Sequence, residues 1–253
     1  MMHSSRRLDD ILRQEEDESL RASNSINFSH CRRLGVDEEL IKTWEIGAQL
    51  DGQEFADHYD MQDYPSVRLN PVEAARELDR LTSEGKIHWY QPNRVPTDLD
   101  IGPTTLIMKS ERSRLVHDWT RAGLNQHLTT PPSKSHNMDD LVAHLWKGCH
   151  IAGLDIKDCF LHWAVHPNSR RRSGVRHPIT GRLGVYLFLP PGLTSAPGIN
   201  ERFVNAIVTA VAQHLNIHVV RYVDDLRIVN SVRLQPAEDK QLLDLQLKCL
   251  SQS

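Results

Sequence analysis

The 253-residue chain carries 30 Lys and Arg against 33 Asp and Glu, a net charge of −3 at pH 7. This balance excludes a protein that binds nucleic acid through overall positive charge, so any such contact must come from a local cluster. No apolar run approaches the roughly 18 residues that span a membrane, and the N-terminus lacks the apolar core of a signal peptide. The four cysteines form no Cys-x-x-Cys pair, which argues against a zinc knuckle. We therefore predict an intracellular protein, in the cytoplasm or nucleus, that is neither secreted nor held in a membrane.

The first 69 residues give the least information. Helical patterns occur over residues 9–20 and 37–50, and no motif or repeat accompanies them. We expect a partly ordered N-terminal extension over residues 1–69.

Residues 70–81 predict the first well-defined helix. Asn70 is a suitable N-cap, and Pro71 suits the first helical position. Gly85 is well placed to end the helix. Apolar side chains recur at near-helical spacing and predict a stripe against a core: Val72, Ala75, Leu78 and Leu81.

Residues 104–109 and 114–119 predict two strands joined by a turn at 111–113, which makes a β-hairpin. Its arms carry basic side chains, Lys109 and Arg114. These are either solvated hairpin charges or phosphate ligands, and the planar fork of an arginine suits the second role.

Three further helices are predicted. Residues 137–148 read as a capped helix that acts as scaffold, with an apolar stripe of Met138, Leu141, Val142 and Leu145. Residues 197–215 give the clearest pattern, with apolar residues every fourth position: Ile199, Phe203, Ile207, Val211 and Leu215. The leucine-rich pattern over residues 238–250 predicts the third helix.

Three carboxylates are the strongest chemical signal. An apolar run over residues 151–154 ends at Asp155, and two β-branched runs flank the adjacent Asp224 and Asp225. The second pattern predicts strand, tight turn and strand. Asp is a common turn residue, so the pair alone does not require chemistry. Three carboxylates on neighbouring strands would repel each other, however, and divalent cations would relieve that repulsion.

A basic cluster falls within thirteen positions: Arg170, Arg171, Arg172, Arg176 and Arg182. Such a cluster is either a solvated loop or a phosphate contact, and the neighbouring carboxylate motifs favour contact with nucleic-acid phosphates.

Three motifs together resemble one family. Residues 222–225, Tyr-Val-Asp-Asp, resemble the Tyr-x-Asp-Asp box of reverse transcriptases. Residues 154–160, Leu-Asp-Ile-Lys-Asp-Cys-Phe, resemble the family's first carboxylate motif. Residues 189–197, Leu-Pro-Pro-Gly-Leu-Thr-Ser-Ala-Pro, resemble its Leu-Pro-Phe-Gly-Leu-x-Ser-Ala-Pro motif. The order of the motifs and the separation of 69 positions from Asp155 to Asp224 (224 − 155) also fit retroelement enzymes of the LTR, gypsy-like or tyrosine-recombinase type.

The resemblance implies an α+β fold: the fingers and palm of a right-hand polymerase, with an antiparallel palm sheet packed on helices. It implies a reverse transcriptase domain over residues 70–253, divided into fingers (about 70–126 and 163–190) and an incomplete palm (about 127–162 and 191–253). The family's primer grip, thumb and RNase H domain have no counterpart, so we expect a region C-terminal to this chain to complete the enzyme.

The implied function is RNA-directed DNA polymerase, with two Mg²⁺ ions (or Mn²⁺) on Asp155, Asp224 and Asp225. Its partners are an RNA or DNA template-primer and deoxynucleoside triphosphates. The alternative is a truncated, inactive retroelement remnant that at most binds nucleic acid.

The resemblance also assigns binding residues. Nucleotide contacts fall on Lys109, Arg114, Asp158, Phe160, Pro191 and Gly192. Nucleic-acid contacts fall on Tyr222 and on Arg170, Arg171 and Arg172. Phe160 matches an aromatic gate against a ribose 2′-hydroxyl, although an ordinary core aromatic gives the same pattern. Pro191 departs from the family's Phe or Gln, and proline has no N–H to offer.

Overall fold

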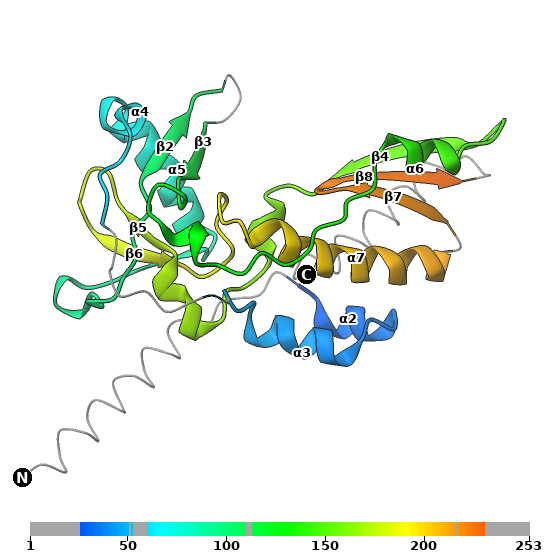
Figure 1. The fold of residues 1–253 in the computed structure, drawn as a ribbon, viewed down its shortest axis with the longest axis horizontal. Helices are drawn as coiled ribbons and strands as arrows, with labels where there is room; N and C mark the ends of the chain where they lie inside the picture. The colour runs from blue at the N-terminus through cyan, green and yellow to red at the C-terminus, as the bar shows by residue number, and fades with distance from the viewer. Residues whose placement is uncertain (1–25, 51, 53–59, 110–112, 216, 231–253) are drawn as a thin grey trace, which may run out of the picture.

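The computed structural model describes residues 26–50, 52, 60–109, 113–215 and 217–230 (Figure 1). Helices and antiparallel sheets occur together in this part of the chain, which confirms a mixed α+β protein. The helices predicted over 9–20 and 238–250 and most of the hairpin turn at 111–113 lie outside the described residues. No helix in the described ranges is both long and apolar enough to cross a bilayer.

A three-stranded antiparallel sheet carries the aspartates. It consists of β4 (His150–Asp155), β8 (Asp225–Asn230) and β7 (His218–Tyr222), in the order β4-β8-β7. In this register Asp155 lies opposite Asp225, and Asp225 lies opposite Tyr222. The predicted strand-turn-strand pattern is therefore confirmed.

Helix α7 (Ala196–Leu215) runs along one face of this sheet (Figure 1). Its predicted apolar stripe is buried at Ile199, Phe203, Ile207 and Val211. The helix and the sheet share one hydrophobic core, because Leu226 of β8 belongs to the same cluster as these side chains.

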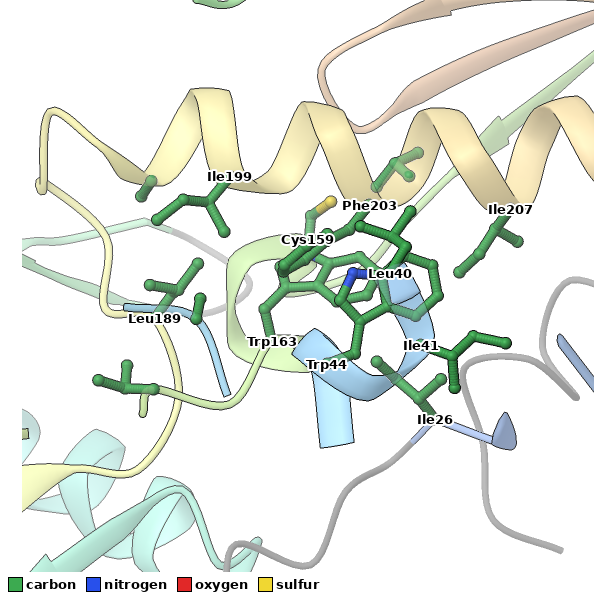
Figure 2. Packing of buried hydrophobic residues seen from close by; sticks show 14 of the residues in the cluster. Ile26, Leu40, Ile41, Trp44, Cys159, Trp163, Leu189, Ile199, Phe203 and Ile207 are labelled. Atoms are coloured by element: carbon green, nitrogen blue, oxygen red, sulfur yellow. The ribbon is translucent and has the colours of Figure 1, made fainter. Parts of the chain in front are cut away.

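Helices α2 (Phe28–Arg33) and α3 (Glu38–Ile46) pack on the side of α7 away from the sheet (Figure 1). Trp44 of α3 meets Phe203 with ring centroids 5.0 Å apart, and Trp163 lies 4.9 Å from Phe203 (Figure 2). Residues 26–50 thus contribute to the main core although they fall in the predicted extension. The domain boundary at residue 69 stays a prediction.

A second core lies under the remaining sheets. Helices α4 (Pro65–Leu69) and α5 (Pro71–Ser83) pack against a sheet of order β1-β6-β5 and the two-stranded hairpin β2-β3. These strands are β1 (Ile87–Trp89), β5 (Gly174–Arg176), β6 (Leu183–Tyr186), β2 (Thr104–Ile107) and β3 (Arg114–His117). Short 3₁₀ helices join the elements: η1 (Pro92–Arg94), η2 (Leu124–Gln126), η3 (Cys159–His162) and η4 (Pro167–Arg172).

The predicted helix after residue 70 is confirmed, with Pro71 at its first position. Asn70 is the N-cap residue of α5, as predicted, but its side chain makes no capping hydrogen bond, because its Nδ2 donates to the Ser66 carbonyl at 3.0 Å. Asn70 is also the C-cap of α4, so its side-chain amide bonds to a carbonyl of that helix instead. Gly85 follows the end of α5 at φ +67°, as its predicted stop requires.

The helix predicted over 137–148 is shorter than expected and is not core scaffold. Helix α6 (Met138–Ala143) begins with a capping box between Asn137 and Asp140 and ends five residues before Gly148. Met138 is 70% exposed and Val142 is 57% exposed. The apolar spacing is present, but α6 lies on the side of the sheet away from α7 (Figure 1), and the described residues form no core beneath the stripe.

Candidate active site

The ends of β4 and β8 bring the three motif aspartates together. Asp155 is the last residue of β4 and pairs in register with Asp225 at the start of β8. The Ile156 N–H donates to the Asp224 carbonyl oxygen at 3.0 Å, which ties the end of β4 to the hairpin turn. Side chains on directly opposed residues share one face of a sheet, so Asp155 and Asp225 face the same side.

The turn itself is strained. Val223 and Asp224 form a two-residue loop between Tyr222 and Asp225, and Val223 adopts φ +56°. A β-branched residue in the left-handed region costs roughly 1–3 kcal/mol. The pairing of β7 with β8 and the bond from Ile156 oppose this cost, so the position of Asp224 is determined by the surrounding structure.

A cavity of about 530 Å³ opens beside these aspartates; we call it the carboxylate cavity. Its wall includes residues from all three motifs, from β3 and from the segment that follows β2. Most of the residues predicted for the site line it: Lys109, Arg114, Asp155, Asp158, Phe160, Pro191 and Asp224. The structure therefore collects these side chains, from separate stretches of sequence, around one space.

Arg80 lines the carboxylate cavity and was not predicted from the sequence. Its guanidinium contacts Glu77 at 2.7 Å, Glu84 at 2.6 Å and Asp158 at 3.4 Å. The hydrogen bond from Arg80 to Glu77 contributes most to raising the pKa of Arg80 above its ordinary value. The spacing to Glu77 and Glu84 suggests only ordinary surface pairs along a helix, and only packing reveals the contact with Asp158.

Asp225 does not line the carboxylate cavity. Its Oδ1 accepts a hydrogen bond from Arg227 Nη1 at 3.1 Å. Arg227 lies over Gly153, where an added Cβ would come within 3.2 Å of the same nitrogen. Asp225 is therefore held by a neighbouring cation and does not contribute to the cavity wall, whereas Asp155 and Asp224 do.

The loop with Pro191 and Gly192 is fixed by residues that follow β3 and by η2. The Trp119 Nε1–H donates to the Pro191 carbonyl at 3.3 Å, and Asn125 Nδ2 donates to the Gly192 carbonyl at 3.0 Å. Gly192 adopts φ +99°, and a Cβ there would lie 2.2 Å from the His117 carbonyl oxygen. Packing inside the protein thus requires this glycine. Its predicted approach to a template or sugar stays a prediction.

Two buried neutral groups, Tyr186 and Cys159, also line the cavity, and His117 lies against the first of them. His117 Nε2 lies 2.8 Å from the Tyr186 hydroxyl, and Tyr186 lines the cavity. Burial lowers the pKa of His117 to about 3, so the ring is neutral at pH 7. Burial also raises the pKa of Cys159 to about 12. The thiol therefore stays protonated and is neither a nucleophile nor a metal ligand at neutral pH.

The residues predicted to contact nucleic acid lie outside the cavity wall. Tyr222 is 63% exposed. Arg170 is buried, and its Nε donates to the Val165 carbonyl at 3.1 Å. Arg171 is exposed and pairs with Asp98 at 2.7 Å, and Arg172 is half-buried. Of the three arginines, Arg171 thus has the most accessible guanidinium.

Comparison with known proteins agrees with the motifs. A family model described as reverse transcriptase (RNA-dependent DNA polymerase) matches residues 106–252, more than half of the chain. The Gag-Pro-Pol polyprotein of mouse mammary tumor virus (strain BR6) is 28% identical over 93 residues. That match covers 34% of this chain and 5% of the polyprotein, so the chain spans only a small part of this relative. The chain belongs to the reverse transcriptase family.

Proposed function

We propose that this chain adds deoxynucleotides to a primer 3′-hydroxyl opposite an RNA template. The observation that carries the proposal is the wall of the carboxylate cavity. Asp155 and Asp224 share that wall with Lys109 and Arg114 of the β2-β3 hairpin. Carboxylates suit divalent cations and cationic side chains suit a triphosphate, so the two halves of a nucleotide–metal complex each have a partner.

The right-hand arrangement belongs to this proposal. The β4-β8-β7 sheet over α7 would be the palm, since it carries the aspartates on its strand ends. The β2-β3 hairpin would be part of the fingers, since its basic arms reach the same cavity. A thumb and an RNase H region beyond this chain stay a prediction.

Mg²⁺ fits the residues present, with Mn²⁺ as a substitute. Within the described ranges no group of three or more His, Cys, Asp or Glu side chains is close enough to hold a metal ion. Mg²⁺ commonly uses one or two carboxylates and takes its other ligands from water and substrate phosphates. Asp155 and Asp224 would hold it, with Asp225 as support. When bound with a nucleotide, two such ions would activate the primer hydroxyl and offset charge on the departing pyrophosphate.

The cations of the cavity would position the nucleotide. Arg114 and Lys109 are exposed on the hairpin arms, where they can bind phosphate oxygens without first leaving a buried partner. Phe160 lines the cavity beside Asp158 and would pack against the sugar. Pro191 would add only apolar contact, because it has no N–H. Asp158 would act indirectly by holding Arg80 in the wall.

Contacts with the template-primer fall on exposed side chains. Tyr222 lies next to the turn with Asp224 and is largely exposed, so its ring is available for stacking on a base. Arg171 and Arg172 are the members of the basic cluster that would meet phosphates. The Nε of Arg170 serves a contact within the protein, so we leave this residue out of the proposal.

The test is primer extension on an RNA template with Mg²⁺, beside an Asp224→Asn variant. Circular dichroism and template-primer binding would be measured on the same samples. Extension by the wild type and none by the variant is the expected result. A folded wild type that binds template-primer yet extends nothing would contradict the proposal. It would favour the alternative, an inactive retroelement remnant that only binds nucleic acid.

A further inference from the structure

A second cavity, of about 430 Å³, lies between α7 and β7, an edge strand of the three-stranded sheet. We call it the donor cavity. Arg221 lines it from β7, His136 lines it from the segment before α6, and Thr209 lines it from α7. No Asp or Glu occurs among its lining residues. The wall therefore offers hydrogen-bond donors and positive charge without a carboxylate that could hold a metal.

The guanidinium of Arg221 is the central group. Arg221 is 2% exposed, and its Nη2 donates to Glu201 Oε1 at 2.9 Å. Its Nε and Nη1 are buried and have no acceptor among the described residues. A buried donor without an acceptor is costly, and such orphans in native proteins commonly mark a missing ion, water or ligand. Arg221 also forms part of the cavity wall, so an acceptor that entered the cavity and reached past its lining would satisfy these two donors.

His136 is fixed beside this arginine. Its Nδ1 accepts the Arg221 backbone N–H at 3.0 Å, and its own backbone N–H donates to the Arg221 carbonyl at 3.0 Å. A neutral ring whose Nδ1 is an acceptor carries its proton on Nε2 and is a donor there. His136 thus adds a second donor that its backbone contacts hold in place.

Helix α7 supplies a polar row to the same wall. Asn205, Thr209 and Gln213 follow one another at intervals of four residues and are exposed. This spacing places them on one helical face. Amide and hydroxyl groups on that face would complement a ligand with several oxygen acceptors.

We propose that the donor cavity binds the phosphate group of a small molecule. A tetrahedral oxyanion offers more acceptors than a carboxylate, which suits a wall that combines Arg221, His136 and the polar row of α7. A volume of about 430 Å³ holds a phosphate with a modest organic group attached. This inference stands on Arg221 and its surroundings and does not depend on polymerase activity.

The test is calorimetric titration of the whole chain with inorganic phosphate and, in a second arm, with AMP. Saturable one-site binding is expected. Thr209→Glu puts a carboxylate on the wall and is expected to weaken binding by about tenfold or more, because like charges repel. Arg202→Glu is the matched control, since Arg202 is exposed on the same helix but does not line the cavity. Its expected effect is about threefold or less, because solvent screens remote charges.

Further variants distinguish the donor cavity from the carboxylate cavity. Gln213→Glu repeats the test at a second exposed position of the wall and is expected to weaken binding as Thr209→Glu does. Arg114→Gln removes a cation from the carboxylate cavity and is expected to leave the phosphate affinity unchanged. Tighter binding of AMP than of phosphate would assign a nucleotide-like ligand, and equal binding would assign the free anion.

Several results would overturn the proposal. One is the absence of saturable phosphate binding. Another is an equal loss in Thr209→Glu and Arg202→Glu, which would indicate a general electrostatic effect. A third is loss of binding in Arg114→Gln alone, which would place the anion in the carboxylate cavity. Displacement of phosphate by a single-stranded oligonucleotide, with the same sensitivity to Thr209→Glu, would assign the site to a nucleic acid instead.

Discussion

Two of the cavities in the described part of the chain touch the three-stranded sheet, and their walls differ in charge. The carboxylate cavity combines acids with cations, because Asp155 and Asp224 share its wall with Arg80 and Arg114. The donor cavity lies against β7 and α7, and its wall has Arg221 and polar groups but no acid. Mixed charge suits a ligand that carries both metal ions and phosphates, whereas charge of one sign suits an anion alone.

The difference also concerns how each wall is assembled. Local sequence motifs supply the three aspartates of the carboxylate cavity, Asp155, Asp158 and Asp224, so chemistry that needs them can be recognised from the sequence. The donor cavity draws one side chain from each of several distant segments, such as His136, Thr209 and Arg221. Its chemistry appears only when packing brings a buried arginine against a helix.

The largest expected effect is a loss of primer extension that leaves phosphate binding at the donor cavity unchanged. Asp155→Asn keeps the size of the side chain but removes its negative charge, so we expect primer extension to fall about 10³-fold or more. The affinity of the donor cavity for phosphate should not change, because Asp155 is not part of its wall. Single-turnover extension and phosphate titration on the same sample measure both. A variant that retains extension within about tenfold of the wild type would contradict the assignment of Asp155.

The next effect is on stability and concerns the donor cavity. Arg221→Met leaves Glu201 without its ion-pair partner in a mostly buried site. Removal of one member of a buried pair typically costs about 3 kcal/mol or more in the free energy of unfolding. Urea unfolding measures this cost, and the exposed Arg202→Met on the same helix is the matched control, at about 0.5 kcal/mol or less. Equal costs for the two variants would mean that the pair with Glu201 contributes little.

A smaller effect concerns nucleotide affinity at the carboxylate cavity. Arg114→Gln removes one exposed cation from the hairpin arm. We expect the KM for the nucleotide to rise about 10- to 100-fold with a smaller change in kcat, because a phosphate contact in the ground state is lost. Steady-state extension at varied nucleotide concentration measures the split. A fall in kcat at constant KM would instead place Arg114 in the chemical step.

The elements best predicted from sequence are those with one dominant local signal. The stripe of α7 repeats along the whole helix, and the aspartate hairpin has β-branched runs on both sides, so both were predicted correctly. The segment after Asn137 shows the limit of this approach. Its apolar spacing and its cap are real, yet Met138 and Val142 lie on a face that nothing in the described chain covers closely. Periodicity predicts a helical face but not what packs against it.

The same limit applies to the site. Motifs identified Asp155 and Asp224 but gave no indication of Arg80, because its spacing to Glu77 and Glu84 is that of any surface helix. Asn125 was missed for a similar reason. A lone polar residue shortly after Gly123 carries no sequence signal, yet it holds the loop at Gly192 by a side-chain hydrogen bond.

The smallest expected effect is acid sensitivity at His117, which contacts Tyr186 in the wall of the carboxylate cavity. Burial lowers the pKa of His117 to about 3 in the folded protein, whereas an unfolded histidine titrates near 6.5. Between these values the unfolded chain binds more protons, so the free energy of unfolding falls as the pH drops below about 6.5. The contribution of His117 reaches up to about 1.4 kcal/mol per pH unit. Urea unfolding at several pH values measures the slope of the free energy of unfolding against pH.

We expect His117→Leu to lower stability at pH 7, because Tyr186 loses a hydrogen-bond partner. We also expect this variant to flatten the slope by about one proton. An unchanged slope in this variant would mean that other groups cause the acid sensitivity and that the ring of His117 is not the neutral, buried contact between β3 and Tyr186.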